Sequence, residues 1–170
     1  MAAVAVIVWA NQVAIADDRV LGAIRRFGYL GVFLGAAISG FNLLVPIPAI
    51  SLLPLIVEAG LDPKLAVLVI AAGMTTGDMV GYLLGRMGRK LVEDPKWLRW
   101  LTSLRERHRL APYVLLFLNA GFSPLPNEVF VIPMALIGCH WAGVFVAALA
   151  GNLIFNSLMA AGITTIFDIL

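Results

Sequence analysis

The sequence is poor in the residues that build disulfides and metal centres. It has one cysteine, Cys139, and two histidines, His108 and His140, that stand far apart. A single cysteine cannot form an intramolecular disulfide, and no Cys or His spacing matches a zinc site. Because no nucleophile–base pair or metal-ligand cluster is visible either, we expect no enzyme activity, no metal and no cofactor.

Charged residues are also scarce, at 13% of 170 residues, whereas apolar residues make up 61%. The mean hydropathy of +0.96 lies far above that of a soluble globular chain. The charge-free run from Phe27 to Val57 exceeds the length that a bilayer crossing needs. These features predict an all-α integral membrane protein that crosses the cell membrane (inner or plasma membrane) several times.

The positive charges are concentrated in one part of the chain. Eight of the twelve Lys and Arg residues fall between Arg86 and Arg109, which places a linker at 87–110 in the cytoplasm. Apolar side chains alternate with these charges, so we expect an amphipathic helix on anionic lipid headgroups and no nucleic-acid partner. The alternating side chains are Trp97, Leu98, Trp100, Leu101 and Leu104.

Two proline-rich stretches interrupt the apolar sequence. Residues 41–55 read FNLLVPIPAISLLPL, and residues 119–136 read NAGFSPLPNEVFVIPMAL. Proline removes a backbone donor and disfavours helix at the preceding residue, so neither stretch is one continuous helix. Broken backbone at membrane depth must be buried in protein or line a polar cavity, and a matching pair is typical of transporter repeats. The predicted hairpin breaks are Pro46, Pro48, Pro124 and Pro126.

These breaks predict an inverted repeat of two re-entrant helical hairpins plus transmembrane helices. Residues 1–26 form N-terminal apolar and amphipathic helices, in which Asp18 caps a helix from Arg19 to Arg26. A single membrane domain follows over 27–170. Asp62 as cap and Pro63 as first helical residue begin its first full crossing. The alternative for residues 28–60 is one kinked crossing. The domain divides into repeat 1 at about 27–86, the linker, and repeat 2 at about 111–167.

Polar residues within the apolar segments are the candidates for function. Asp78 lies inside a crossing and Glu128 follows the second proline pair, so both are predicted as proton-titratable groups that contact or couple to substrate. Arg86 lies near the cytoplasmic end, where it could neutralise a phosphate or extend to lipid headgroups. Glu128 could instead cap a half-helix, and asparagines could bind hairpin backbone. The remaining candidates are Asn119, Asn127 and Asn152.

Four glycines share one face of the first crossing. Small residues four apart let another helix approach closely, either within one chain or between two copies of a homo-oligomer. They are Gly73, Gly77, Gly81 and Gly85. The stretch AAGMTTGD around them parallels LAGNLIFN in the second half, which includes Asn152 and Asn156.

Over roughly residues 20–160, the sequence resembles the DedA family, also called the VTT or SNARE-associated-Golgi-like superfamily. The resemblance rests on FGYLGVFL from Phe27, the Pro-x-Pro pair, GDMVGYLLGRMGRK from Gly77, and GCHWAGVFVAALAGNLIF from Gly138. It implies two opposed re-entrant hairpins and the translocation of polyprenyl-phosphate or phospholipid by a flippase or scramblase. Membrane lipids are then the expected partners.

The chain departs from that family at the positions that would contact a lipid phosphate. Many bacterial members carry two arginines in the second hairpin, where this sequence has about Gly121 and Asn127. Carboxylates frequent around the first hairpin are replaced here by apolar or amide residues. This indicates a divergent branch, and the alternative function is a proton- or ion-coupled transporter of a small solute.

Overall fold

The computed structural model describes residues 18–40, 49–89, 96–123 and 125–169, and its regular elements in these ranges are all helical. Two helices are long and apolar enough to cross a membrane: α4 (Pro63–Gly88) and the part Trp141–Gly162 of α8 (Trp141–Ile169). The predicted all-helical class is confirmed, and the two candidate spans are compatible with the predicted membrane protein. The predictions for Pro46, Pro48 and Pro124, and for the helix within residues 1–16, fall outside the described residues.

Large apolar side chains cover much of the outer surface. In water such a surface would favour aggregation, whereas lipid tails cover it at no cost, so it fits a membrane protein. Exposed examples on successive helices are Leu30, Leu34, Ile38, Leu68, Leu83, Val114, Leu118, Val129 and Val146.

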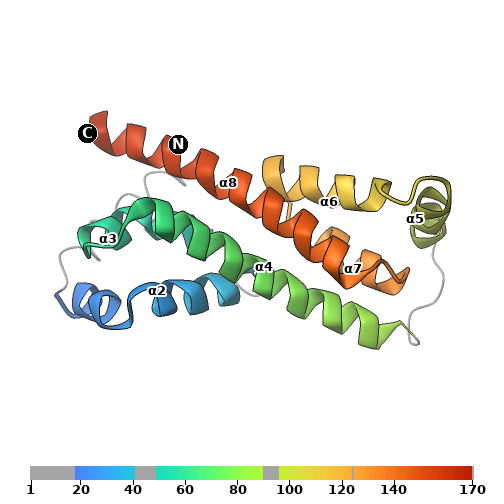
Figure 1. The fold of residues 1–170 in the computed structure, drawn as a ribbon, viewed down its shortest axis with the longest axis horizontal. Coiled ribbons are helices and arrows are strands. Elements are labelled where there is room, and N and C mark those ends of the chain that lie inside the picture. Colours follow the sequence, from blue (N-terminus) through green and yellow to red (C-terminus); the bar gives the residue numbers. More distant parts are fainter. Residues whose placement is uncertain (1–17, 41–48, 90–95, 124, 170) are drawn as a thin grey trace.

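The long helices α4 and α8 run antiparallel and form the long axis of the molecule (Figure 1). Helix α4 begins as the sequence predicts, because the Asp62 side chain accepts a hydrogen bond from the Leu65 N–H at 2.9 Å and Pro63 is the first helical residue. The helix continues to Gly88, two residues past Arg86.

A shorter helical pair packs along the first half of α4. Helix α2 (Asp18–Gly40) joins the expected amphipathic helix to the next apolar segment, with a kink at Gly28, whose φ of 52° favours glycine. The chain returns through η1 (Ala49–Leu52) and α3 (Leu53–Glu58). The pair is held at the start of α4, where Tyr29 Oη accepts a hydrogen bond from the Asp62 N–H at 2.9 Å.

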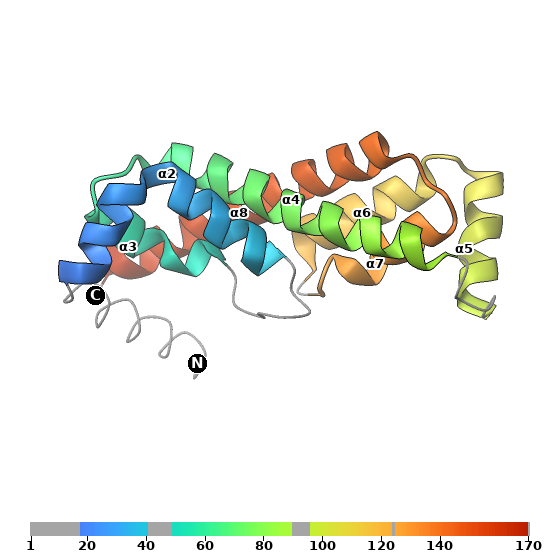
Figure 2. The same ribbon diagram turned by 90° about the horizontal axis from the view of Figure 1, so that it is seen from below.

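Helix α5 (Lys96–Arg107) lies across one end of the molecule (Figure 2). It is amphipathic, but the expected apolar face is divided. Leu98 and Leu101 are buried against the protein, whereas Trp97 and Trp100 are exposed. The leucines therefore pack the helix against the bundle, whereas the tryptophans face outward.

A second helical pair follows. Helix α6 (Ala111–Phe122) and helix α7 (Glu128–Leu136) are separated by a break that reverses the chain direction. This pair is held at the start of α8, where the His140 N–H donates a hydrogen bond to Tyr113 Oη at 2.9 Å. Both ends of the pair thus lie beside the start of α8.

Glycines allow the helical pairs to approach the long helices closely. A Cβ placed on Gly73 would lie 2.6 Å from the Phe33 carbonyl oxygen on α2, so only glycine fits there. A Cβ on Gly151 of α8 would lie 2.5 Å from Ala120 Cβ on α6. Gly85 makes a similar contact with α7. These contacts join helices within one chain, which was one of the two expected roles of the glycine face.

We expect Gly73→Ala and Gly151→Ala each to destabilise the protein by about 1–3 kcal/mol, because backbone must move to admit the methyl group. The measurement is unfolding in detergent followed by circular dichroism. Gly162→Ala is the control, since its Cβ would meet open space. Equal stability of all three variants would contradict this close packing.

Candidate polar site between the long helices

Five polar side chains meet where α4 and α8 cross. Thr75 and Asp78 lie near the middle of α4, and Asn152 lies near the middle of the apolar part of α8. Asn119 belongs to the last turn of α6, and Asn127 immediately precedes α7. All five, called the polar cluster below, are buried.

Asp78 is the centre of the cluster. Its Oδ2 atom accepts hydrogen bonds from Asn152 Nδ2 at 2.9 Å and from Asn127 Nδ2 at 3.1 Å. The same two asparagines bond to each other, because Asn127 Nδ2 also lies 3.1 Å from Asn152 Oδ1. Asn152 Nδ2 further donates to Thr75 Oγ1 at 3.0 Å. Three elements are thereby connected through one carboxylate.

The cluster also holds the break between α6 and α7. Asn119 Nδ2 donates to Asn127 Oδ1 at 3.1 Å and to the Leu125 carbonyl oxygen at 3.3 Å. The second bond supplies a donor to a backbone oxygen that no helix satisfies. The interpretation of the asparagines as partners of hairpin backbone therefore applies to Asn119.

A second carboxylate lies beside Asp78. Glu128 is buried in the first turn of α7 and lies close enough to interact electrostatically with Asp78. The buried polar residues of the described part of the chain include no lysine or arginine. Asp78 Oδ1 is buried and makes no hydrogen bond there. The site therefore presents carboxyl oxygen and amide groups, which can exchange a proton or bind polar groups of a ligand.

The structure brings together Asp78, Asn119, Asn127 and Asn152 from the predicted set, with Glu128 next to them. Arg86 is not part of the cluster: it is exposed and lies eight residues further along α4, about 12 Å by helix rise. Of the predicted hairpin breaks, Pro126 lies in the described break, immediately before Asn127.

Two residues of the site were expected only as hydrogen-bonding partners, Thr75 of Asp78 and Asn156 of hairpin backbone. Thr75 accepts from Asn152, and Asn156 Nδ2 donates to the Asn152 carbonyl oxygen at 2.7 Å and to Met74 Sδ at 3.4 Å. The parallel between AAGMTTGD and LAGNLIFN contains a signal for Asn156, which it aligns with Asp78, whereas Thr75 aligns with the apolar Leu153.

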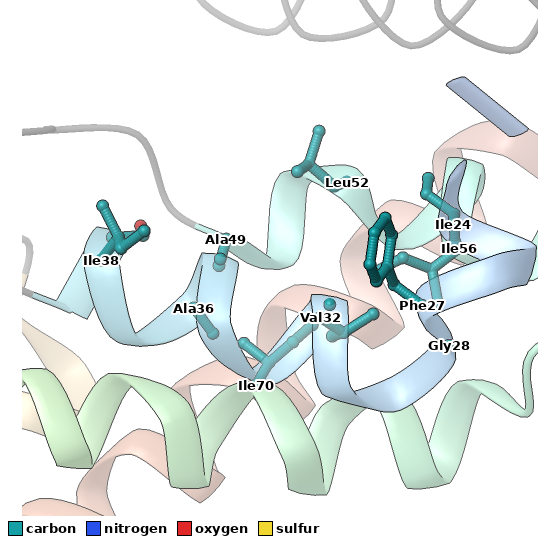
Figure 3. A pocket seen from close by; sticks show the side chains of 13 residues that line it. Ile24, Phe27, Gly28, Val32, Ala36, Ile38, Ala49, Leu52, Ile56 and Ile70 are labelled. Carbon is teal, nitrogen blue, oxygen red and sulfur yellow. The ribbon is translucent and has the colours of Figure 1, made fainter. Parts of the chain in front are cut away.

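An apolar groove lies within the first helical pair (Figure 3), and no residue of the polar cluster lines it. Its volume is about 460 Å³, and it opens between α2, η1 and α3 with α4 as its floor. Ser39 lines it, and the next residue, Gly40, packs on the Met74 backbone within the turn that carries Thr75. The labelled side chains Phe27, Val32, Ala36, Leu52, Ile56 and Ile70 show its apolar character.

Comparisons with protein-family models, curated proteins and solved structures found no match to this chain. The resemblance to the DedA family therefore rests on the sequence motifs quoted above, and the site has to be interpreted from its own geometry.

We expect Asp78 and Asn127 to be energetically coupled. In a double-mutant cycle of Asp78→Ala and Asn127→Ala, the coupling free energy should be about 0.6–1.7 kcal/mol, as found for hydrogen bonds between transmembrane helices. The measurement is the free energy of unfolding of the wild type, both single variants and the double variant in detergent. Additive single effects would contradict a bond between these residues.

Proposed function

We propose that the protein translocates a phosphate-bearing lipid, a polyprenyl-phosphate or a phospholipid, between the leaflets of the cell membrane. The observation that carries the proposal is a buried cluster of amides and carboxyls at mid-length of the two candidate spans. A headgroup crossing the hydrocarbon core needs polar partners at that depth, because an unsatisfied polar group there costs several kcal/mol.

Matching contacts in the two halves support an inverted repeat. Tyr29 bonds to the residue before α4, and Tyr113 bonds to the residue before α8. Gly73 contacts Phe33 and Ala36, and Gly151 contacts Phe117 and Ala120, so the same close approach occurs twice. Since α4 and α8 run in opposite directions, the two sets of contacts are inverted relative to each other.

The reach of the helical pairs supports re-entrant hairpins. Along α4, the contacts of α2 extend from Asp62, before its first residue, to Met74 near its middle. Along α8, the contacts of the α6–α7 pair extend from His140 to Asn152. Each pair thus starts at one end of a long helix, reaches mid-depth and returns, as a segment that enters and leaves the bilayer on one side would.

The apolar groove favours a lipid over a small solute. A solute transporter needs a cavity closed to the hydrocarbon core, whereas this groove is open to the surface and lined almost wholly by apolar side chains. A lipid could place a hydrocarbon tail against this apolar lining.

In this mechanism the two buried carboxyls act as proton carriers. Asp78 has amide donors on one oxygen only, and it interacts electrostatically with Glu128. Protonation of either carboxylate would remove one negative charge and so reduce its repulsion of an anionic headgroup. We infer proton coupling through these two residues.

The test is translocation of fluorescent phospholipid and of polyprenyl-phosphate in liposomes that contain purified protein, with and without a pH gradient. We expect Asp78→Asn and Glu128→Gln to lower the rate at least tenfold while circular dichroism stays unchanged. Glu58→Gln is the matched control, because Glu58 is an exposed carboxylate at the end of α3.

Wild-type protein that is folded but moves neither lipid would refute the lipid proposal and favour the solute transporter. Equal rates for the wild type and the two cluster variants would exclude the carboxyls from the mechanism.

A further inference from the structure

A second cavity lies at the other end of α4, beside the turn between α7 and α8. Its volume is about 460 Å³, and Tyr82 and Arg86 of α4, with Arg89 directly after the helix, form one wall. The turn itself forms the opposite wall, with Gly138, Cys139, His140 and Trp141. Polar and basic side chains make up a much larger part of its lining than they do in the apolar groove.

Hydrogen bonds hold the turn in place. Tyr82 Oη donates to the Cys139 carbonyl oxygen at 2.7 Å, and Arg105 of α5 donates to the carbonyl oxygen of Ile137. Tyr113 Oη accepts from the His140 N–H. Three helices thus fix the backbone of the turn, and a ligand bound there would find a preformed wall.

Guanidinium groups converge on this wall. Gly138 has a φ of 75°, and a Cβ on it would lie 3.2 Å from Arg89 Nη1 and 3.6 Å from Arg105 Nη1. Arg86 faces the same cavity. Arginine stays charged in proteins, so these groups repel one another unless an anion lies between them.

The described residues that line the cavity include no carboxylate. Glu106 on α5 lines a separate cavity, together with Thr102, Arg105 and Arg109. The positive charge around Gly138 is therefore not neutralised by the residues that form this cavity.

We propose that this cavity binds a phosphomonoester group. The planar forks of Arg86 and Arg89 match phosphate oxygens in geometry as well as charge. Trp141 and His140 are exposed at the rim, where a headgroup at the membrane surface would meet them. The site is distinct from the polar cluster and does not depend on lipid translocation.

The test is isothermal titration of the purified full-length protein in a non-ionic detergent. One arm uses dihexanoyl phosphatidic acid, a second uses inorganic phosphate, and dihexanoyl phosphatidylcholine serves as the probe without a phosphomonoester. We expect Arg86→Gln and Arg89→Gln each to weaken binding about tenfold, the loss of one charge-assisted hydrogen bond.

Arg107→Gln is the matched control, because Arg107 is an exposed arginine at the end of α5 that does not line the cavity. Binding of both probes would identify the phosphate group itself as the ligand, and binding of phosphatidic acid alone would identify a lipid headgroup. The proposal is overturned if folded wild type binds neither dihexanoyl phosphatidic acid nor inorganic phosphate. It is also overturned if Arg107→Gln weakens binding as much as the cavity variants.

Discussion

The carboxylate of Asp78 can stay buried only while amide donors from two other elements reach it. An apolar helix in lipid has little to fix its rotation or its height relative to a neighbour, since one hydrocarbon surface packs much like another. The bonds from Asn127 and Asn152 remove that freedom, because they require α8 and the start of α7 to face one point on α4. The rest of the arrangement follows from this requirement.

Close glycine contacts and tyrosine bonds complete the arrangement. The amides of Asn127 and Asn152 determine which parts of α8 and of the start of α7 lie against the middle of α4. Tyr29 and Tyr113 determine where each helical pair begins. Gly73 and Gly151 bring the pairs near enough for both conditions to hold together. A larger residue at Gly151 would move α6, which carries Asn119, away from α8, and a larger residue at Gly73 would move α2 away from α4.

The sequence predicted the helical class, the start of α4 at Asp62–Pro63 and most of the polar cluster, because caps and rare polar residues are visible without a structure. It could not show which amides meet, since this depends on the rotation of α8 against α4. Arg86 was predicted near the end of its crossing, and it lies in the last turn of α4, apart from the buried carboxyls. The kink at Gly28 coincides with the predicted boundary between residues 1–26 and the membrane domain, but its left-handed backbone could not be predicted from the sequence.

The turn between α7 and α8 carries the sole cysteine of the chain, and this has a practical consequence. Cys139 is buried, and burial raises the pKa of its thiol above the ordinary value, so little of the reactive thiolate exists at neutral pH. Maleimide reagents should leave the native chain almost unlabelled. Cysteines introduced one at a time on exposed helix faces can then report sidedness and water accessibility without removal of the native residue.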